Sequence, residues 1–133
     1  MRSFAIIGVA FAASVAALTI TEPGGHNKCV DITKPILVKW EIRGDPAVKD
    51  ELSFNLWNAI SLYPNVNDPF PIGQSPALRV KSSAGAYLLP PVSAAKAESY
   101  RNNANQGRNF QIKVPDPETY SNPFTIAAPN GGC

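Results

Sequence analysis

The chain has 133 residues, of which 12 are lysine or arginine and 10 are aspartate or glutamate, so its formal net charge at pH 7 is only +2. With no basic run or stripe, nucleic acid is not expected as a partner. The charged fraction is low at 17%, whereas 13 prolines and 9 glycines mark many turns, which indicates a compact, loop-rich β protein.

The first 17 residues have the layout of a secretory signal peptide. Arg2 supplies a positive start, residues 4–15 are almost wholly apolar, and Ala16 and Ala17 offer small residues for cleavage. The apolar run is too short for a membrane span, and no second run follows. We therefore expect a secreted protein, extracellular or in a cell wall, whose residues 18–133 form one domain.

The clearest strand pattern in the chain lies at residues 36–42. After a short first strand at 18–21 and a turn-rich connection at 23–35, this run alternates apolar and polar residues, with its inner face formed by Ile36, Val38, Trp40 and Ile42. Three branched aliphatics in phase with Trp40 predict that this indole lies in the core. Turn residues at 44–46 end the strand.

A second alternating run covers residues 52–58. Leu52, Phe54 and Leu56 fall on its inner face, which places Trp57 on the polar face. There the indole is either a flat platform for a sugar ring or a cover over neighbouring sheet and loop residues. Residues 61–76 contain four prolines and predict a long, stiff surface loop without a regular element.

Further short strands are expected at 78–81, 86–89, 109–114 and 123–126. Between them, Ser93 can cap a helix over the alanine-rich residues 94–100. The whole pattern predicts an all-β fold, an immunoglobulin- or fibronectin-like antiparallel β-sandwich of about seven strands with one short helix.

The two cysteines, Cys29 and Cys133, have no metal-binding spacing. In an oxidising compartment they predict one disulfide that closes a loop of roughly a hundred residues, with two unpaired or intermolecularly paired thiols as the alternative. Many immunoglobulin-like sandwiches place their first and last strands side by side and parallel, which would bring these cysteines to one pole. His26 is the only histidine and is interpreted as a solvated loop residue, so we expect no metal and no cofactor.

The acidic residues give little sign of catalysis. A glycosidase needs two carboxylates that flank a cleft, but the acidic side chains all lie near predicted turns: Asp45, Asp50, Glu51, Asp68, Asp116 and Glu118. The sequence also lacks a G-x-S-x-G elbow and a phosphate loop. We therefore do not expect an enzyme.

Binding to a neutral glycan is the chemistry that remains. Exposed aromatic rings can stack on sugars while amides hydrogen-bond the hydroxyl groups. The aromatic candidates for binding are Trp57, Tyr63, Phe70, Tyr87 and Tyr120, with Tyr100 as a further one, and the amides are Asn102, Asn103 and Asn105. The sequence does not show which of them are neighbours.

The order of these segments resembles the fungal Kre/Knh-like cell-wall glucan-synthesis N-terminal domain family, also described as a serine/threonine-rich, glycosylphosphatidylinositol-anchored family. The matching segments are residues 18–23, 36–40, 52–58, 85–87, 107–114 and 120–126. The resemblance implies an extracellular sandwich linked to β-glucan assembly, with no catalytic residues to transfer. Relative to the family, Leu89 replaces an aromatic, residues 93–106 are an insertion, and the serine/threonine-rich stalk and anchor signal are missing, so we expect a soluble, short member.

Two functions follow as expectations. The first is a secreted, non-catalytic, cell-wall-associated module that binds or organises β-glucan. The second is a small secreted effector or elicitor that recognises a host component, because the chain combines a signal peptide, one domain, a disulfide and no anchor.

Overall fold

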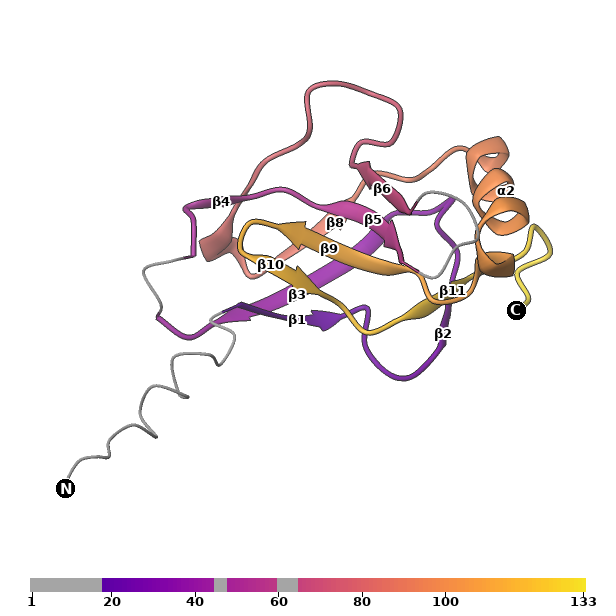
Figure 1. Ribbon diagram of the computed structural model, residues 1–133. Coiled ribbons are helices and arrows are strands. Elements are labelled where there is room, and N and C mark those ends of the chain that lie inside the picture. The colour runs from indigo at the N-terminus through magenta and orange to yellow at the C-terminus, as the bar shows by residue number, and fades with distance from the viewer. Residues whose placement is uncertain (1–17, 45–47, 60–64) are drawn as a thin grey trace.

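Short strands dominate the chain. The computed structural model describes residues 18–44, 48–59 and 65–133, and Figure 1 shows how their elements are arranged. These residues form β1 (Leu18–Glu22), β2 (Lys28–Val30), β3 (Ile36–Ile42), β4 (Glu51–Leu52), β5 (Asn55–Asn58), β6 (Val66–Pro69), β7 (Val80–Lys81), β8 (Ala86–Leu89), β9 (Gln111–Pro115), β10 (Glu118–Tyr120) and β11 (Phe124–Ile126), the helix α2 (Ala94–Asn103) and the 3-10 turns η1 (Ser82–Ala84) and η2 (Asn105–Gly107).

Two antiparallel sheets form the layers of the fold. One has the strand order β1-β3-β8 and the other β10-β9-β5-β6. Two small two-stranded sheets, β4-β7 and β2-β11, complete the described strands. The buried hydrophobic side chains of all four sheets belong to one hydrophobic cluster. The predicted all-β sandwich-like fold with one short helix is therefore confirmed.

Trp40 lies in the core between the layers, as predicted. Its side chain is only 4% exposed, and its ring centroid is 5.5 Å from that of Phe54. The indole Nε1 donates a hydrogen bond of 2.7 Å to the carbonyl oxygen of Ser82, so burial leaves no polar atom of the ring unpaired.

Ile42 is an exception to the predicted inner face of β3. Its side chain is 36% exposed, whereas Ile36 and Val38 are buried. Ile42 is the last residue of β3 and pairs with Leu18, the first residue of β1. The alternation is correct, but the last buried residue is Trp40, two residues before the end of the strand.

The parallel pair β2-β11 differs from the expectation. The last strand pairs with the second strand rather than the first, with Thr125 opposite Cys29. Cys29 therefore lies inside a strand that the sequence did not predict. The chain then turns back after β11, and Cys133 forms a disulfide with Cys29, as predicted.

Two other strands were missed. β6 lies inside residues 61–76, where the prolines predicted no regular element, and β10 follows directly on a turn with two prolines. β6 and β10 are the two edge strands of their sheet, where a missing backbone N–H is tolerated. Pro69 accordingly ends β6.

The helix α2 begins where the sequence places it. Ser93 is its N-cap, and the hydroxyl of Ser93 accepts a 3.2 Å hydrogen bond from the backbone N–H of Lys96. α2 is bound to the sandwich through Tyr100, which is 5% exposed and packs against Phe110. The Tyr100 hydroxyl donates a 2.6 Å hydrogen bond to Asp68 Oδ2 on β6.

The burial of the Tyr100 phenol makes the free energy of unfolding decrease at alkaline pH. Burial first, and then the hydrogen bond and negative charge of Asp68, raise the pKa of Tyr100 well above its ordinary value of 10.0. The folded state therefore keeps a proton that the unfolded state loses above about pH 10, and folding loses stability as the pH rises through that region, by at most about 1.4 kcal/mol per pH unit. We expect the unfolding free energy of the wild type to fall progressively as the pH rises above about 10, and that of Tyr100→Phe to fall less over the same range. Urea titrations of both proteins check this, and an identical decline in both would contradict it.

Candidate functional site

The outer face of the sheet β10-β9-β5-β6 is the candidate site. Because side chains alternate along each strand, those opposite the buried Leu56, Ile112 and Val114 point away from the core. The strand register then aligns the outward side chains in rows across the sheet. These are Asn55, Trp57, Asn67, Gln111, Lys113, Glu118 and Tyr120.

An aromatic pair with a lysine forms the centre of this face. Trp57 and Tyr120 are half-buried, and their ring centroids are 5.8 Å apart at an interplanar angle of 57°. The Lys113 ammonium lies 4.2 Å from the Trp57 centroid and 5.6 Å from the Tyr120 centroid. The Lys113 side chain is only 12% exposed, so both rings and its stem are packed into one unit.

Glu118 fixes the polar end of this unit. Glu118 Oε2 accepts a 2.6 Å hydrogen bond from the Tyr120 hydroxyl and lies 3.7 Å from Lys113 Nζ. The hydrogen bond from Tyr120 to Glu118 is the main cause that raises the pKa of the Tyr120 phenol above its ordinary value. The Glu118 carboxylate thus fixes the orientation of the Tyr120 ring.

Amide side chains flank the rings. Asn55 Nδ2 donates a 2.7 Å hydrogen bond to Asn67 Oδ1 across β5 and β6. Gln111, opposite Trp57, donates from Nε2 to the carbonyl oxygen of Ser121 at 2.8 Å. Each amide keeps a second polar group that is not used in these bonds. The arrangement places two partly exposed rings and fixed amides on one sheet surface, which suits a neutral, hydroxyl-rich ligand.

The sequence-predicted binding residues are not all on this face. Trp57 and Tyr120 come together, whereas Tyr87 is 41% exposed on β8 in the other sheet. Two candidates are corrected, because Phe70 is fully buried and Tyr100 is 5% exposed, so neither ring is a surface platform. Tyr63 lies outside the described residues, and the proposed amides Asn102, Asn103 and Asn105 belong to α2 and η2.

Five polar members of the site were missed by sequence reasoning. Asn55 shares the outward phase of Trp57, and Gln111 and Lys113 follow from the alternation of residues 109–114, so a signal for these three was present. Asn67 and Glu118 had none, because β6 and β10 were not predicted.

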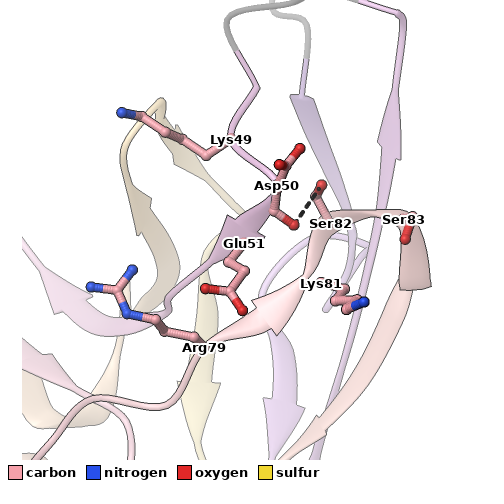
Figure 2. Close-up of a pocket in the computed structure, with 7 residues that line it drawn as sticks. All are labelled: Lys49, Asp50, Glu51, Arg79, Lys81, Ser82 and Ser83. Carbon is pink, nitrogen blue, oxygen red and sulfur yellow. Dashed lines mark hydrogen bonds between the residues drawn. The ribbon is translucent and has the colours of Figure 1, made fainter.

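Apart from this sheet face, the structure has a charged hollow beside β4 and β7 with a volume of about 650 Å³. Figure 2 shows its lining, which consists of Lys49, Asp50, Glu51, Arg79, Lys81, Ser82 and Ser83. The Asp50 and Glu51 carboxylates point in different directions, as expected for successive residues at the start of a strand. They do not face each other across the hollow as the two acids of a glycosidase do.

His26 is exposed in a turn. Among the residues that the structure describes, no three side chains of the metal-ligating types His, Cys, Asp and Glu are grouped as a metal site requires.

In residues 18–44, 48–59 and 65–133, no helix is both long enough and apolar enough to cross a membrane.

One curated protein similar to this chain comes from Aspergillus fumigatus and is described as a UPF0619 GPI-anchored membrane protein. The two are 28% identical over 141 residues, which cover 96% of this chain and 59% of that protein. The chain thus spans about three fifths of the length of its relative. No family model and no solved structure matches the chain.

These findings correct the family assignment. The order of the strand segments suggested the Kre/Knh-like family, and this prediction was wrong, because no model of that family matches and the similarity is to a protein named for UPF0619. The segments consist of short strands and the turns beside them, a pattern that many unrelated sandwiches share.

Proposed function

We propose that the protein is a non-catalytic glycan-binding module of the fungal cell surface, and that it binds β-glucan through Trp57 and Tyr120. The observation that carries the proposal is that both rings lie on one outward sheet face, 5.8 Å apart, between amide side chains. The predicted signal peptide and the relative described as GPI-anchored support an extracellular location.

The chemistry of this face matches a neutral saccharide. The C–H faces of a glucose ring pack against aromatic rings, while its hydroxyl groups need donors and acceptors in fixed positions. Lys113 and Glu118 hold the rings in place before a ligand arrives, which lowers the entropy lost on binding. The diverging carboxylates of Asp50 and Glu51 support a binding role over a hydrolytic one.

Retention on insoluble β-glucan tests the proposal. We expect the wild type to bind and both Trp57→Ala and Tyr120→Ala to lose about tenfold or more in affinity, as residues at the centre of a binding surface do. Tyr87→Ala is the matched control, because it removes an exposed ring from the other sheet and is expected to bind normally. Chitin serves as the comparison polysaccharide. Absence of retention for the wild type, or equal retention for all variants, would contradict the proposal.

A second candidate is an effector that recognises a host protein. It is favoured by an apolar strip on the sheet β1-β3-β8, where Leu37 and Leu88 are cross-strand partners that are 42% and 59% exposed. Such surfaces commonly contact other proteins. Infiltration of the purified protein into plant tissue separates the two, because a module that only binds glucan provokes no response there.

A further inference from the structure

Arg101 is a cation without a partner. It lies in the last turn of α2 and is half-buried, and its Nε atom is inaccessible to solvent and has no hydrogen-bond partner. Within the described part of the chain, its guanidinium forms neither a hydrogen bond nor an ion pair. Partly buried charges are normally paired, because desolvation without compensation is costly. Such a group indicates that a ligand completes the site.

Arg101 lines a polar hollow next to the C-terminal segment. The hollow has a volume of about 530 Å³ and is formed by the end of α2, the η2 turn and β11. Its lining consists of Arg101, Asn102, Gln106, Arg108, Thr125, Ile126 and Cys133. None of these described lining residues has an acidic side chain. The negative group at the hollow is the terminal carboxylate of Cys133, which forms no ion pair with Arg101 or Arg108 in the described structure, so the two guanidinium groups leave a net positive charge there.

The η2 turn brings the second arginine to the same hollow. Gly107 has φ +82, a conformation that favours glycine, and a Cβ at this position would make a tight contact of 3.1 Å with Cγ of Arg101, so the backbone passes close over the arginine stem. Beyond it, Arg108 Nη2 donates a 3.1 Å hydrogen bond to Gln106 Oε1. This bond orients the guanidinium and leaves its other N–H groups and the Gln106 amide nitrogen available.

Two carboxylates lie on the other side of Arg101. A smaller hollow of about 150 Å³ is lined by Arg101 together with Asp31 and Glu98, among others. Neither acid forms an ion pair with Arg101 in the described structure. The Asp31 carboxylate instead accepts hydrogen bonds from the backbone N–H and hydroxyl of Thr33. These acids are the alternative partners that an experiment has to exclude.

We propose that Arg101 and Arg108 bind the oxyanion of an acidic saccharide, a phosphate or carboxylate group carried on a sugar. Guanidinium groups match the geometry of both oxyanions. The hollow has the volume of a small-molecule site and is much larger than one oxyanion needs. Asn102, Gln106 and Thr125 supply the amide and hydroxyl groups that recognise sugar hydroxyls. This site is separate from Trp57 and Tyr120 and does not depend on the proposed β-glucan binding.

Calorimetric titration of the whole chain with glucose 6-phosphate, glucuronate, inorganic phosphate and glucose tests the inference. We expect the two acidic sugars to bind, inorganic phosphate to bind more weakly than glucose 6-phosphate, and glucose not to bind here. The ratio of the affinities for glucose 6-phosphate and glucuronate shows whether the site prefers a phosphate or a carboxylate. Arg101→Gln is expected to lower the affinity for the acidic sugars by about tenfold or more, because it removes a charge-assisted contact.

Matched variants make the result decisive. Arg79→Gln removes an arginine from the other hollow, and Trp57→Ala removes a ring from the sheet face; both are expected to bind the acidic sugars as the wild type does. Circular dichroism confirms that each variant is folded. The proposal is overturned if the wild type binds no acidic sugar, if Arg101→Gln binds as well as Arg79→Gln, or if inorganic phosphate binds as tightly as its sugar ester. Asp31→Asn or Glu98→Gln tests whether these acids compete with the ligand for Arg101. A higher affinity for the acidic sugars in either variant supports the proposal, whereas a lower affinity in both overturns it.

Discussion

Replacement of Trp40 by alanine is expected to lower the free energy of unfolding by about 3–5 kcal/mol, as for other large aromatic truncations in cores. The indole is 4% exposed and contacts Phe54 across the layers. Its loss leaves a cavity and also leaves the Ser82 carbonyl oxygen without its donor. Chemical denaturation followed by circular dichroism measures the change.

Trp57→Ala is the matched control for this prediction. Trp57 lies half-buried on the outer face, so we expect its truncation to cost only about 1 kcal/mol or less. Similar large losses from both tryptophans would mean that the outer face of β5 contributes to the core, and would contradict the site as described.

Removal of the disulfide is the second prediction with a large effect. The bridge joins residues separated by 104 positions, and the chain-entropy estimate for a loop of this length is about 4–5 kcal/mol. The double variant Cys29→Ser, Cys133→Ser is therefore expected to lose a large part of a typical domain stability of about 5–15 kcal/mol. Thermal and urea unfolding of the oxidised wild type and of the variant measure this loss.

Reducing agent provides the control. It is expected to destabilise the wild type to the level of the double variant and to leave the double variant unchanged. If the double variant is as stable as the oxidised wild type, the closed loop does not restrict the unfolded chain in the way that the estimate assumes.

The central strands were predictable because each has one face in the core. β3, β5 and β9 alternate between buried and outward residues, and this period is visible in a single sequence. The N-cap of α2 was equally clear, since Ser93 precedes a run of helix formers. The short strands β2, β6 and β10 were not visible, because none of them contains a buried residue that would mark an apolar, alternating face.

The candidate site depends on pairings that no local pattern shows. Trp57 and Tyr120 are neighbours only because β9 lies between their strands, with Gln111 opposite Trp57 and Lys113 opposite Tyr120. Phe70 shows the reverse case. It was expected on a surface loop, but its backbone N–H bonds to the Phe54 carbonyl oxygen and its ring enters the core.

The covalent link between β2 and the C-terminal segment also determines how the domain responds to mechanical tension. A pull applied between residue 18 and Cys133 passes directly through the sulfur bridge to Cys29. Residues 30–132, which include both layers apart from β1, lie inside the closed loop and cannot be stretched out by that force. Only β1 and the residues up to Cys29 lie on the path of this force, so the bridge shields from direct pulling the segments that carry both proposed sugar-binding surfaces.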